Sequence, residues 1–118
     1  MKIRWLTIQE INLAAKAGRK EAFLNCEHHW WQLSHATLDQ YIKAPVKTHG
    51  DFCALCVRYT GKCNSCKLYC PLVWRRVGKA VCEGDPVAWK KATRAMHAHI
   101  VTKIHTFYPN LVIPKHKE

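Results

Sequence analysis

The sequence has few acidic residues and lacks long apolar runs, internal repeats and low-complexity tracts. Its 118 residues include 8 Asp+Glu against 19 Lys+Arg, which gives a formal net charge of +11. No apolar stretch approaches the roughly 18 residues that a membrane-spanning helix needs. The N-terminus, Met1-Lys2-Ile3-Arg4-Trp5, lacks the apolar core and small-residue cleavage site of a signal peptide, so we expect a cytoplasmic protein.

Recognisable catalytic signatures are missing as well. The chain offers no nucleophile–base pair, and its few carboxylates leave little for acid–base chemistry. The sequence therefore predicts a binding protein rather than an enzyme. A net charge of this size attracts polyanions, which are nucleic acids first and acidic protein surfaces second. We expect an acidic macromolecule as the partner, either nucleic acid or a protein, with no membrane and no small-molecule substrate.

Cysteine, by contrast, is abundant, and six of the seven cysteines follow the spacing C-x2-C-x6-C-x2-C-x3-C-P-x10-C. Two successive C-x-x-C pairs supply four soft thiolate ligands, which suit zinc or an iron–sulfur cluster. In a reducing cytoplasm, clustered thiols bind metal more often than they form disulfides. The pattern indicates a structural zinc site, and the alternative is a 4Fe-4S cluster in a redox or sensing protein. The candidate ligands are Cys53, Cys56, Cys63, Cys66, Cys70 and Cys82.

Four segments between residues 20 and 90 carry a further signal. They are His29-Trp30, Cys53-Ala54-Leu55-Cys56, Cys66-Lys67-Leu68-Tyr69-Cys70-Pro71-Leu72 and Cys82-Glu83-Gly84-Asp85-Pro86. Together they resemble a pattern in small cysteine-rich proteins that phage and prophage genomes encode, a family with no agreed activity. The resemblance implies a phage accessory protein in the host cytoplasm, where a protein partner would be a host protein complex that it modulates or inhibits. It also implies that Cys53, Cys56, Cys66 and Cys70 are the metal ligands, with Cys82 as a fifth candidate and Cys63 as a surplus thiol.

Helix signals in the first 44 residues predict a helical N-terminal part. Thr7 and Glu10 can form a capping box before a helix that ends at Gly18. The recurrence of apolar residues at three- and four-residue steps predicts a second helix over about residues 19–35. Thr37 can cap a brief helix that ends near Tyr41. The second helix carries a buried stripe, made of Phe23, Cys26, Trp30 and Leu33. Cys26 is therefore expected to be a core residue and not a ligand.

The C-terminal part is predicted to be one long basic amphipathic helix. Asp85-Pro86 provides an N-cap and a proline at the first helical position, and Pro109 stops the helix after Tyr108. Before it, residues 71–77 allow a helical turn or two that Gly78 ends. The expected fold is mainly α and a single domain. It comprises two N-terminal helices (1–44), an irregular Cys-rich metal knuckle (45–84), the long helix (85–108) and a tail (109–118).

The long helix also supplies the predicted interaction surface. Its apolar stripe faces the core and comprises Trp89, Ala92, Met96, Ile100, Ile104 and Phe107. The basic residues lie mostly on other faces. Together with Trp31 of the N-terminal part, an aromatic residue expected to be exposed, they are the predicted partner-binding residues: Lys90, Lys91, Arg94, Lys103 and Trp31. Three histidines of this helix, His97, His99 and His105, are expected to be surface residues, because steps of two residues point side chains to different faces.

Overall fold

The computed structural model describes residues 3–45, 47–48, 53–59 and 71–116, with positions 71–73 described by backbone alone. In these ranges the chain is mainly helical and contains no strand. The helices are α1 (Ile8–Ala17), α2 (Arg19–His35), α3 (Leu38–Ile42), α4 (Ala54–Arg58), α6 (Pro71–Glu83) and α7 (Pro86–Phe107). The predicted mainly α fold with a long C-terminal helix is confirmed. None of the described helices has the length and apolar character needed to span a membrane.

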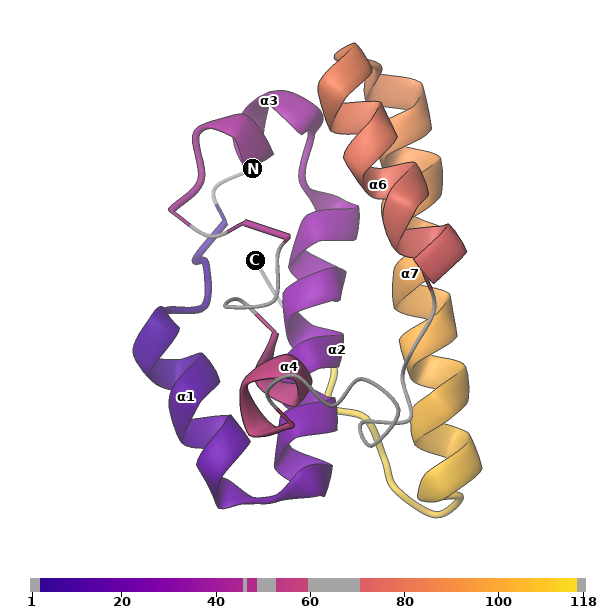
Figure 1. The fold of residues 1–118 in the computed structure, drawn as a ribbon. Coiled ribbons are helices and arrows are strands. Elements are labelled where there is room, and N and C mark those ends of the chain that lie inside the picture. Colours follow the sequence, from indigo (N-terminus) through magenta and orange to yellow (C-terminus); the bar gives the residue numbers. More distant parts are fainter. Residues whose placement is uncertain (1–2, 46, 49–52, 60–70, 117–118) are drawn as a thin grey trace.

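Helix α2 lies at the centre of the arrangement (Figure 1). It packs against α1 and α4 on one side and against α7 on the other, while α6 packs against α7. Helix α4 is only five residues long, yet it contacts both α1 and α2. The guanidinium of Arg58 at its end donates to the carbonyl of Ala15 at 2.8 Å. These contacts hold the first cysteines of the C-x-x-C series against the centre of the helical core.

Local capping explains where three of the helices begin. The Thr7 hydroxyl accepts from the amide of Glu10, whose carboxylate accepts from the amide of Thr7. Thr37 and Gln40 repeat this arrangement at the start of α3. At the start of α7, the carboxylate of Asp85 accepts from two backbone amides at 3.1 Å. The predicted starts of α1, α3 and α7 are confirmed. Such caps could be predicted because they depend only on residues close together in the sequence.

Helix α6 is longer than the sequence predicts. Gly78 does not end it, since the helix continues through Glu83. A buried face, which includes Val77 and Ala80, packs against α7 and outweighs the cost of about 1 kcal/mol for an internal glycine. The helix ends instead at Gly84, whose φ of 63° suits glycine. Gly84 and Asp85 connect α6 to α7 in a tight hairpin. Because α6 is a regular helix, thirteen residues of the segment predicted to be an irregular knuckle are helical.

The core lies between α2 and α7. The predicted stripes of both helices are buried except for the partly buried Phe107, with Trp30 at 2% and Trp89 at 0% exposure. The Trp89 ring stacks on Tyr41 at 4.6 Å, and its indole N–H donates to the carbonyl of Ala36. Stacked aromatic rings with a satisfied N–H are well suited to a buried position. This packing fixes α3 and the end of α2 against α7.

Candidate metal centre and basic surface

Two thiols from distant parts of the chain meet in the core. The Sγ atoms of Cys26 and Cys53 lie 3.7 Å apart, and both side chains are buried. Cys26 lies in the middle of α2, whereas Cys53 is the N-cap residue of α4. The half-buried Cys56 lies one turn further along α4, and its thiol interacts with that of Cys53. The sequence places Cys26 in the core correctly, but it does not indicate this contact with the C-x-x-C pair.

The surroundings of these thiols disfavour reactive thiolates in the absence of a bound cation. The hydrogen bond with Cys26 raises the pKa of Cys53 well above its usual range, and burial acts in the same direction. The interaction with Cys53 likewise raises the pKa of Cys56, with burial as the second cause. Buried thiols of this kind are poor nucleophiles. These thiols are therefore poor candidates for covalent chemistry.

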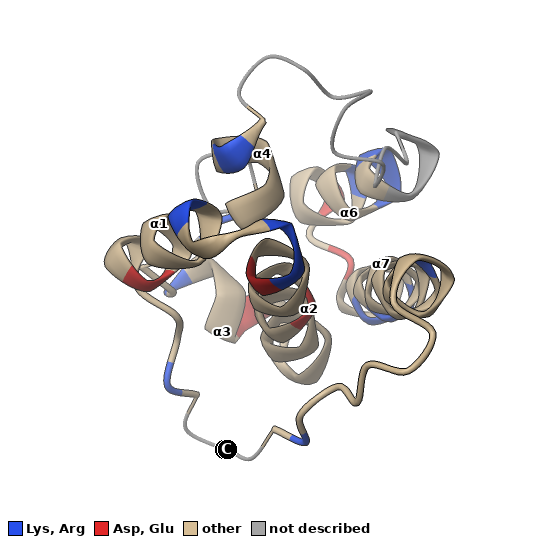
Figure 2. Cartoon of the chain, turned by 90° about the horizontal axis from the view of Figure 1, so that it is seen from below, with Lys and Arg blue, Asp and Glu red and all other residues tan. Residues whose placement is uncertain are grey.

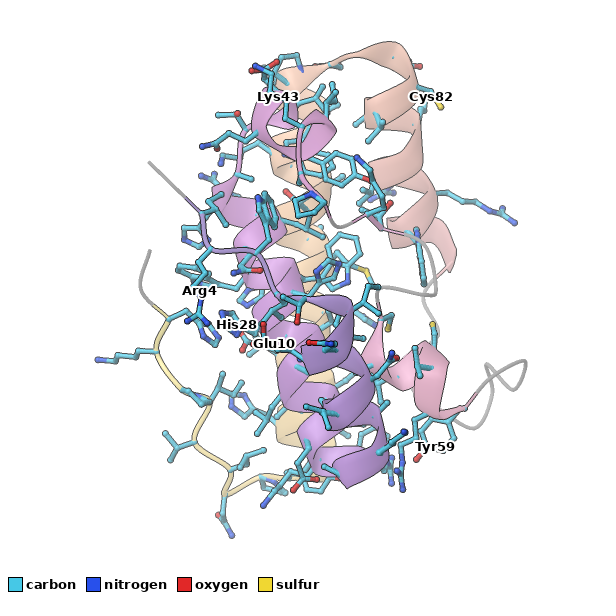
Figure 3. The ribbon with its side chains drawn as sticks, turned by 90° about the vertical axis from the view of Figure 1, so that its left-hand side faces the viewer. Arg4, Glu10, His28, Lys43, Tyr59 and Cys82 are labelled. Atoms are coloured by element: carbon cyan, nitrogen blue, oxygen red, sulfur yellow. The ribbon has the colours of Figure 1, made fainter. Side chains whose placement is uncertain are left out.

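The predicted ligand set is brought together only in part. Cys53 and Cys56 lie side by side, whereas Cys63, Cys66 and Cys70 fall outside the described residues. Cys82 is exposed on α6, far from α4 along the hairpin (Figure 3). Within the described ranges, no group of three or more His, Cys, Asp or Glu side chains is arranged to hold a metal ion. This part of the chain therefore supplies a thiol pair, Cys26 and Cys53, with Cys56 beside it.

A groove of about 360 Å³ runs between α6 and α7. Each helix contributes residues at steps of three and four, so the lining forms one face of each helix. Small residues line its floor, namely Ala80, Ala88, Ala92 and Ala95. Exposed charged residues stand at its rim, namely Arg76, Lys79, Glu83 and Lys91. We call this feature the α6–α7 groove; Figure 2 shows lysines and arginines on both of its helices.

The predicted partner-binding lysines and arginines have different surroundings. Lys91 and Arg94 are exposed, whereas Lys103 is half-buried. The ammonium of Lys90 donates to the carbonyls of Ser34 at 3.0 Å and Ala36 at 3.2 Å, and burial lowers its pKa. These carbonyls lie at the C-terminal end of α2, where a cation is favourable. Lys90 thus ties α7 to α2.

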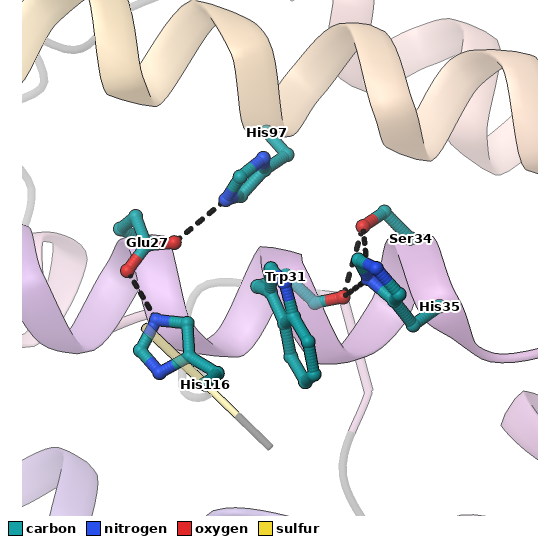
Figure 4. A network of polar contacts seen from close by, with 6 residues as sticks. All are labelled: Glu27, Trp31, Ser34, His35, His97 and His116. Carbon is teal, nitrogen blue, oxygen red and sulfur yellow. Dashed lines mark hydrogen bonds and ion pairs between the residues drawn. The ribbon is translucent and has the colours of Figure 1, made fainter. Parts of the chain in front are cut away.

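A buried carboxylate joins three distant segments of the chain (Figure 4). Glu27 on α2 is 2% exposed, and its two oxygens accept from Nε2 of His97 and Nε2 of His116, each at 2.6 Å. The His116 ring stacks on His28 at 4.0 Å, which holds the C-terminal tail against α2. The prediction that His97 is a surface residue is wrong, because its ring is partly buried in this pair. A glutamate on a mostly apolar stripe was the signal that a cationic partner should exist.

Trp31 and His29 lie on the same helix but in contrasting surroundings. Trp31 is half-buried, with its ring stacked on His35 at 4.1 Å and 5.2 Å from the ring of His116. His29 is fully buried, and its Nε2 lies 3.1 Å from the carbonyl of Lys47. Burial lowers the pKa of His29 to about 4, so its ring is neutral at physiological pH. Because its ring contacts His35 and His116, Trp31 is less available to a partner than the sequence suggests.

Known proteins add no function to these features. Comparisons with protein-family models, with curated proteins and with solved structures give no significant match. The resemblance to phage-encoded proteins stays a prediction. The thiol pair, the α6–α7 groove and the Glu27 network are therefore the features from which a function can be inferred.

Proposed function

We propose that this protein is a small zinc-stabilised binding protein, without catalytic chemistry of its own, whose basic α6–α7 surface binds nucleic acid. The observation that carries the proposal is the charge around the α6–α7 groove. From Arg75 to Lys103 the α6–α7 hairpin, its connection included, holds seven lysines and arginines against two acidic residues. Five of these basic side chains are exposed, namely Arg75, Arg76, Lys79, Lys91 and Arg94.

Nucleic acid is the polyanion that best matches this surface. Same-sign charges on one hairpin repel each other and add nothing to its packing, so a partner that neutralises them explains their presence. The exposed groups are spread along two antiparallel helices and are not gathered at a single point. Phosphate contacts by such residues supply affinity without reading sequence. We therefore expect binding that is weakly selective and strongly dependent on salt.

The zinc site in this proposal is structural and comprises Cys53, Cys56, Cys66 and Cys70, as the resemblance to phage-encoded proteins implies. Four thiolates leave no open coordination position for catalysis. Binding of the ion would contribute directly to folding of the middle of the chain. Following the resemblance to phage proteins, we place the activity in the host cytoplasm. A purified protein that is brown instead of colourless would favour the alternative iron–sulfur cluster.

Charge reversal in the groove tests the proposal. Fluorescence anisotropy would measure binding to a random-sequence DNA duplex and to single-stranded RNA at several salt concentrations. The variant Arg76→Glu, Lys91→Glu should weaken binding and reduce the magnitude of the log–log salt slope by about 2, since each phosphate contact contributes about 0.9. The matched control is Lys16→Glu, Lys20→Glu, which makes the same change in net charge at exposed positions on α1 and α2.

The control separates a local site from the overall charge. If both variants lose the same affinity, only the net charge matters and the groove is not the site. If the wild-type binds neither nucleic acid, the proposal is wrong. Retention of one host protein from a lysate, lost in the Arg76→Glu, Lys91→Glu variant and kept in the control, would then move the partner to the protein class.

A further inference from the structure

The thiol of Cys26 is part of the core, and it lies at the distance from the thiol of Cys53 that two ligands of one metal ion have. Its Sγ lies 3.7 Å from Sγ of Cys53. Zinc bound tetrahedrally by thiolates at about 2.3 Å separates any two of its ligand sulfurs by about 3.8 Å. The observed separation matches that edge, and it is far longer than a disulfide bond of about 2.0 Å. The two thiols are therefore spaced as two ligands of one ion.

The elements that carry these thiols make the arrangement specific. Cys53 is the N-cap of α4 and Cys56 lies in its first turn, where the two thiols interact. Helix α4 packs against α2, so this turn faces the buried stripe that contains Cys26. Cys26 itself lies in the middle of a 17-residue helix, which holds its position rigidly. A ligand on such a helix is better oriented than one on a loop.

We infer that Cys26 and Cys53 are ligands of the same metal ion, so that one thiolate site joins α2 to α4. This inference rests on the proposed zinc site and revises its ligand set, in which Cys26 takes the place of one of the four predicted cysteines. Metal binding would stabilise the packing of the core as well as the local turn.

The spacing also favours a single ion over the alternative cluster. In a 4Fe-4S cluster each of the four thiolates binds a different iron, so the ligand sulfurs are farther apart than two sulfurs on one ion. A mononuclear tetrahedral site separates two ligand sulfurs by one edge of the tetrahedron, which is the separation observed between Cys26 and Cys53. Zinc is the metal that cysteine ligands of this kind most commonly hold in structural sites.

Cadmium-113 NMR tests the ligand set in the unmodified protein. Cadmium replaces zinc in thiolate sites, and three-bond coupling between ¹¹³Cd and cysteine Hβ protons identifies each ligand directly. We expect correlations from Cys26 and Cys53, and none from the exposed Cys82. Correlations from four other cysteines without Cys26 would overturn this inference while the zinc site stands. A reduced protein that binds neither cadmium nor zinc would instead overturn the metal site of the proposed function.

A variant provides a second measurement. Cys26→Ala keeps a small apolar side chain in the core, and Cys82→Ala removes an exposed thiol as the control. We expect Cys26→Ala to bind Co²⁺ more than about 100-fold more weakly, since even outer partners of ligands are worth 10–100-fold. Its thiolate-to-cobalt charge-transfer absorption should also fall, whereas Cys82→Ala should match the wild-type. An unchanged cobalt spectrum in Cys26→Ala, or a Cys26–Cys53 disulfide in protein purified without oxygen, would refute the inference.

Discussion

Replacing Glu27 with glutamine should destabilise the protein by about 2–4 kcal/mol at neutral pH. The carboxylate is 2% exposed and accepts two hydrogen bonds of 2.6 Å from His97 and His116. A hydrogen bond to a charged group contributes about 1.5–3 kcal/mol, so the pair could reach about 3–6 kcal/mol. The glutamine oxygen can still accept one of them, which reduces the loss to the lower range.

The dependence of this loss on pH follows from the pKa of Glu27. Burial raises the pKa of Glu27, but the hydrogen bonds from His97 and His116 lower it by more. The pKa of Glu27 therefore lies below 4.5. A carboxyl whose pKa is lowered by folding contributes stability above its unfolded pKa, and the contribution is lost as the pH falls through the folded value. The difference between wild-type and Glu27→Gln should therefore be largest near neutral pH and should shrink below pH 4.5.

Urea denaturation followed by tryptophan fluorescence, at pH 7 and at pH 4, would measure both quantities. Glu21→Gln is the control, because Glu21 is an exposed carboxylate on the same helix. Its loss should stay within about 0.5 kcal/mol. If Glu27→Gln costs no more than this control at pH 7, the network does not stabilise the fold. A cycle with His116→Gln would then show whether the tail contributes at all.

Three further results are expected from denaturation experiments. The folded-state pKa of His29 is about 4 against 6.5 unfolded, so the wild-type should lose about 3 kcal/mol as the pH falls from 6.5 to 4. In His29→Gln, whose side chain can still donate to the carbonyl of Lys47, the loss of stability over this pH range should be smaller by about 3 kcal/mol. Lys90→Met should cost about 1–2 kcal/mol because two carbonyls lose their donor, whereas Lys91→Met should stay within about 0.5 kcal/mol. A chelator should lower the melting temperature of the zinc-loaded protein, and an unchanged transition would argue against a structural metal.

Much of the helical framework could be predicted from the sequence because its signals are local. Thr7, Thr37 and Asp85 satisfy amides two or three residues away, and such bonds form whatever the rest of the fold does. Gly78 shows the limit of local reasoning. A glycine favours the end of a helix, but the packing of Val77 and Ala80 against α7 continues α6 past it. That contact depends on another helix, and the segment itself gives no sign of it.

The candidate site was less predictable, because its members are far apart in the sequence. Cys26 lies 27 residues before Cys53, and Glu27 lies 89 residues before His116. Helical periodicity reports which face of α2 is buried, but it does not report what is packed against that face. A cysteine on the stripe was equally consistent with an ordinary core residue. Only the position of α4 over α2 distinguishes the two interpretations.

The basic residues illustrate how packing divides a uniform sequence signal into two roles. Lys90, Lys91 and Arg94 look alike on one helix, yet Lys90 bonds the end of α2 while the other two are exposed. A charge held by backbone carbonyls is unavailable to phosphates, so its removal should change stability and not the salt dependence of binding. Of the two exposed charges on α7, Lys91 lines the groove together with Arg76 and Lys79 of α6. An acidic partner would therefore contact the hairpin across both helices, and not α7 alone.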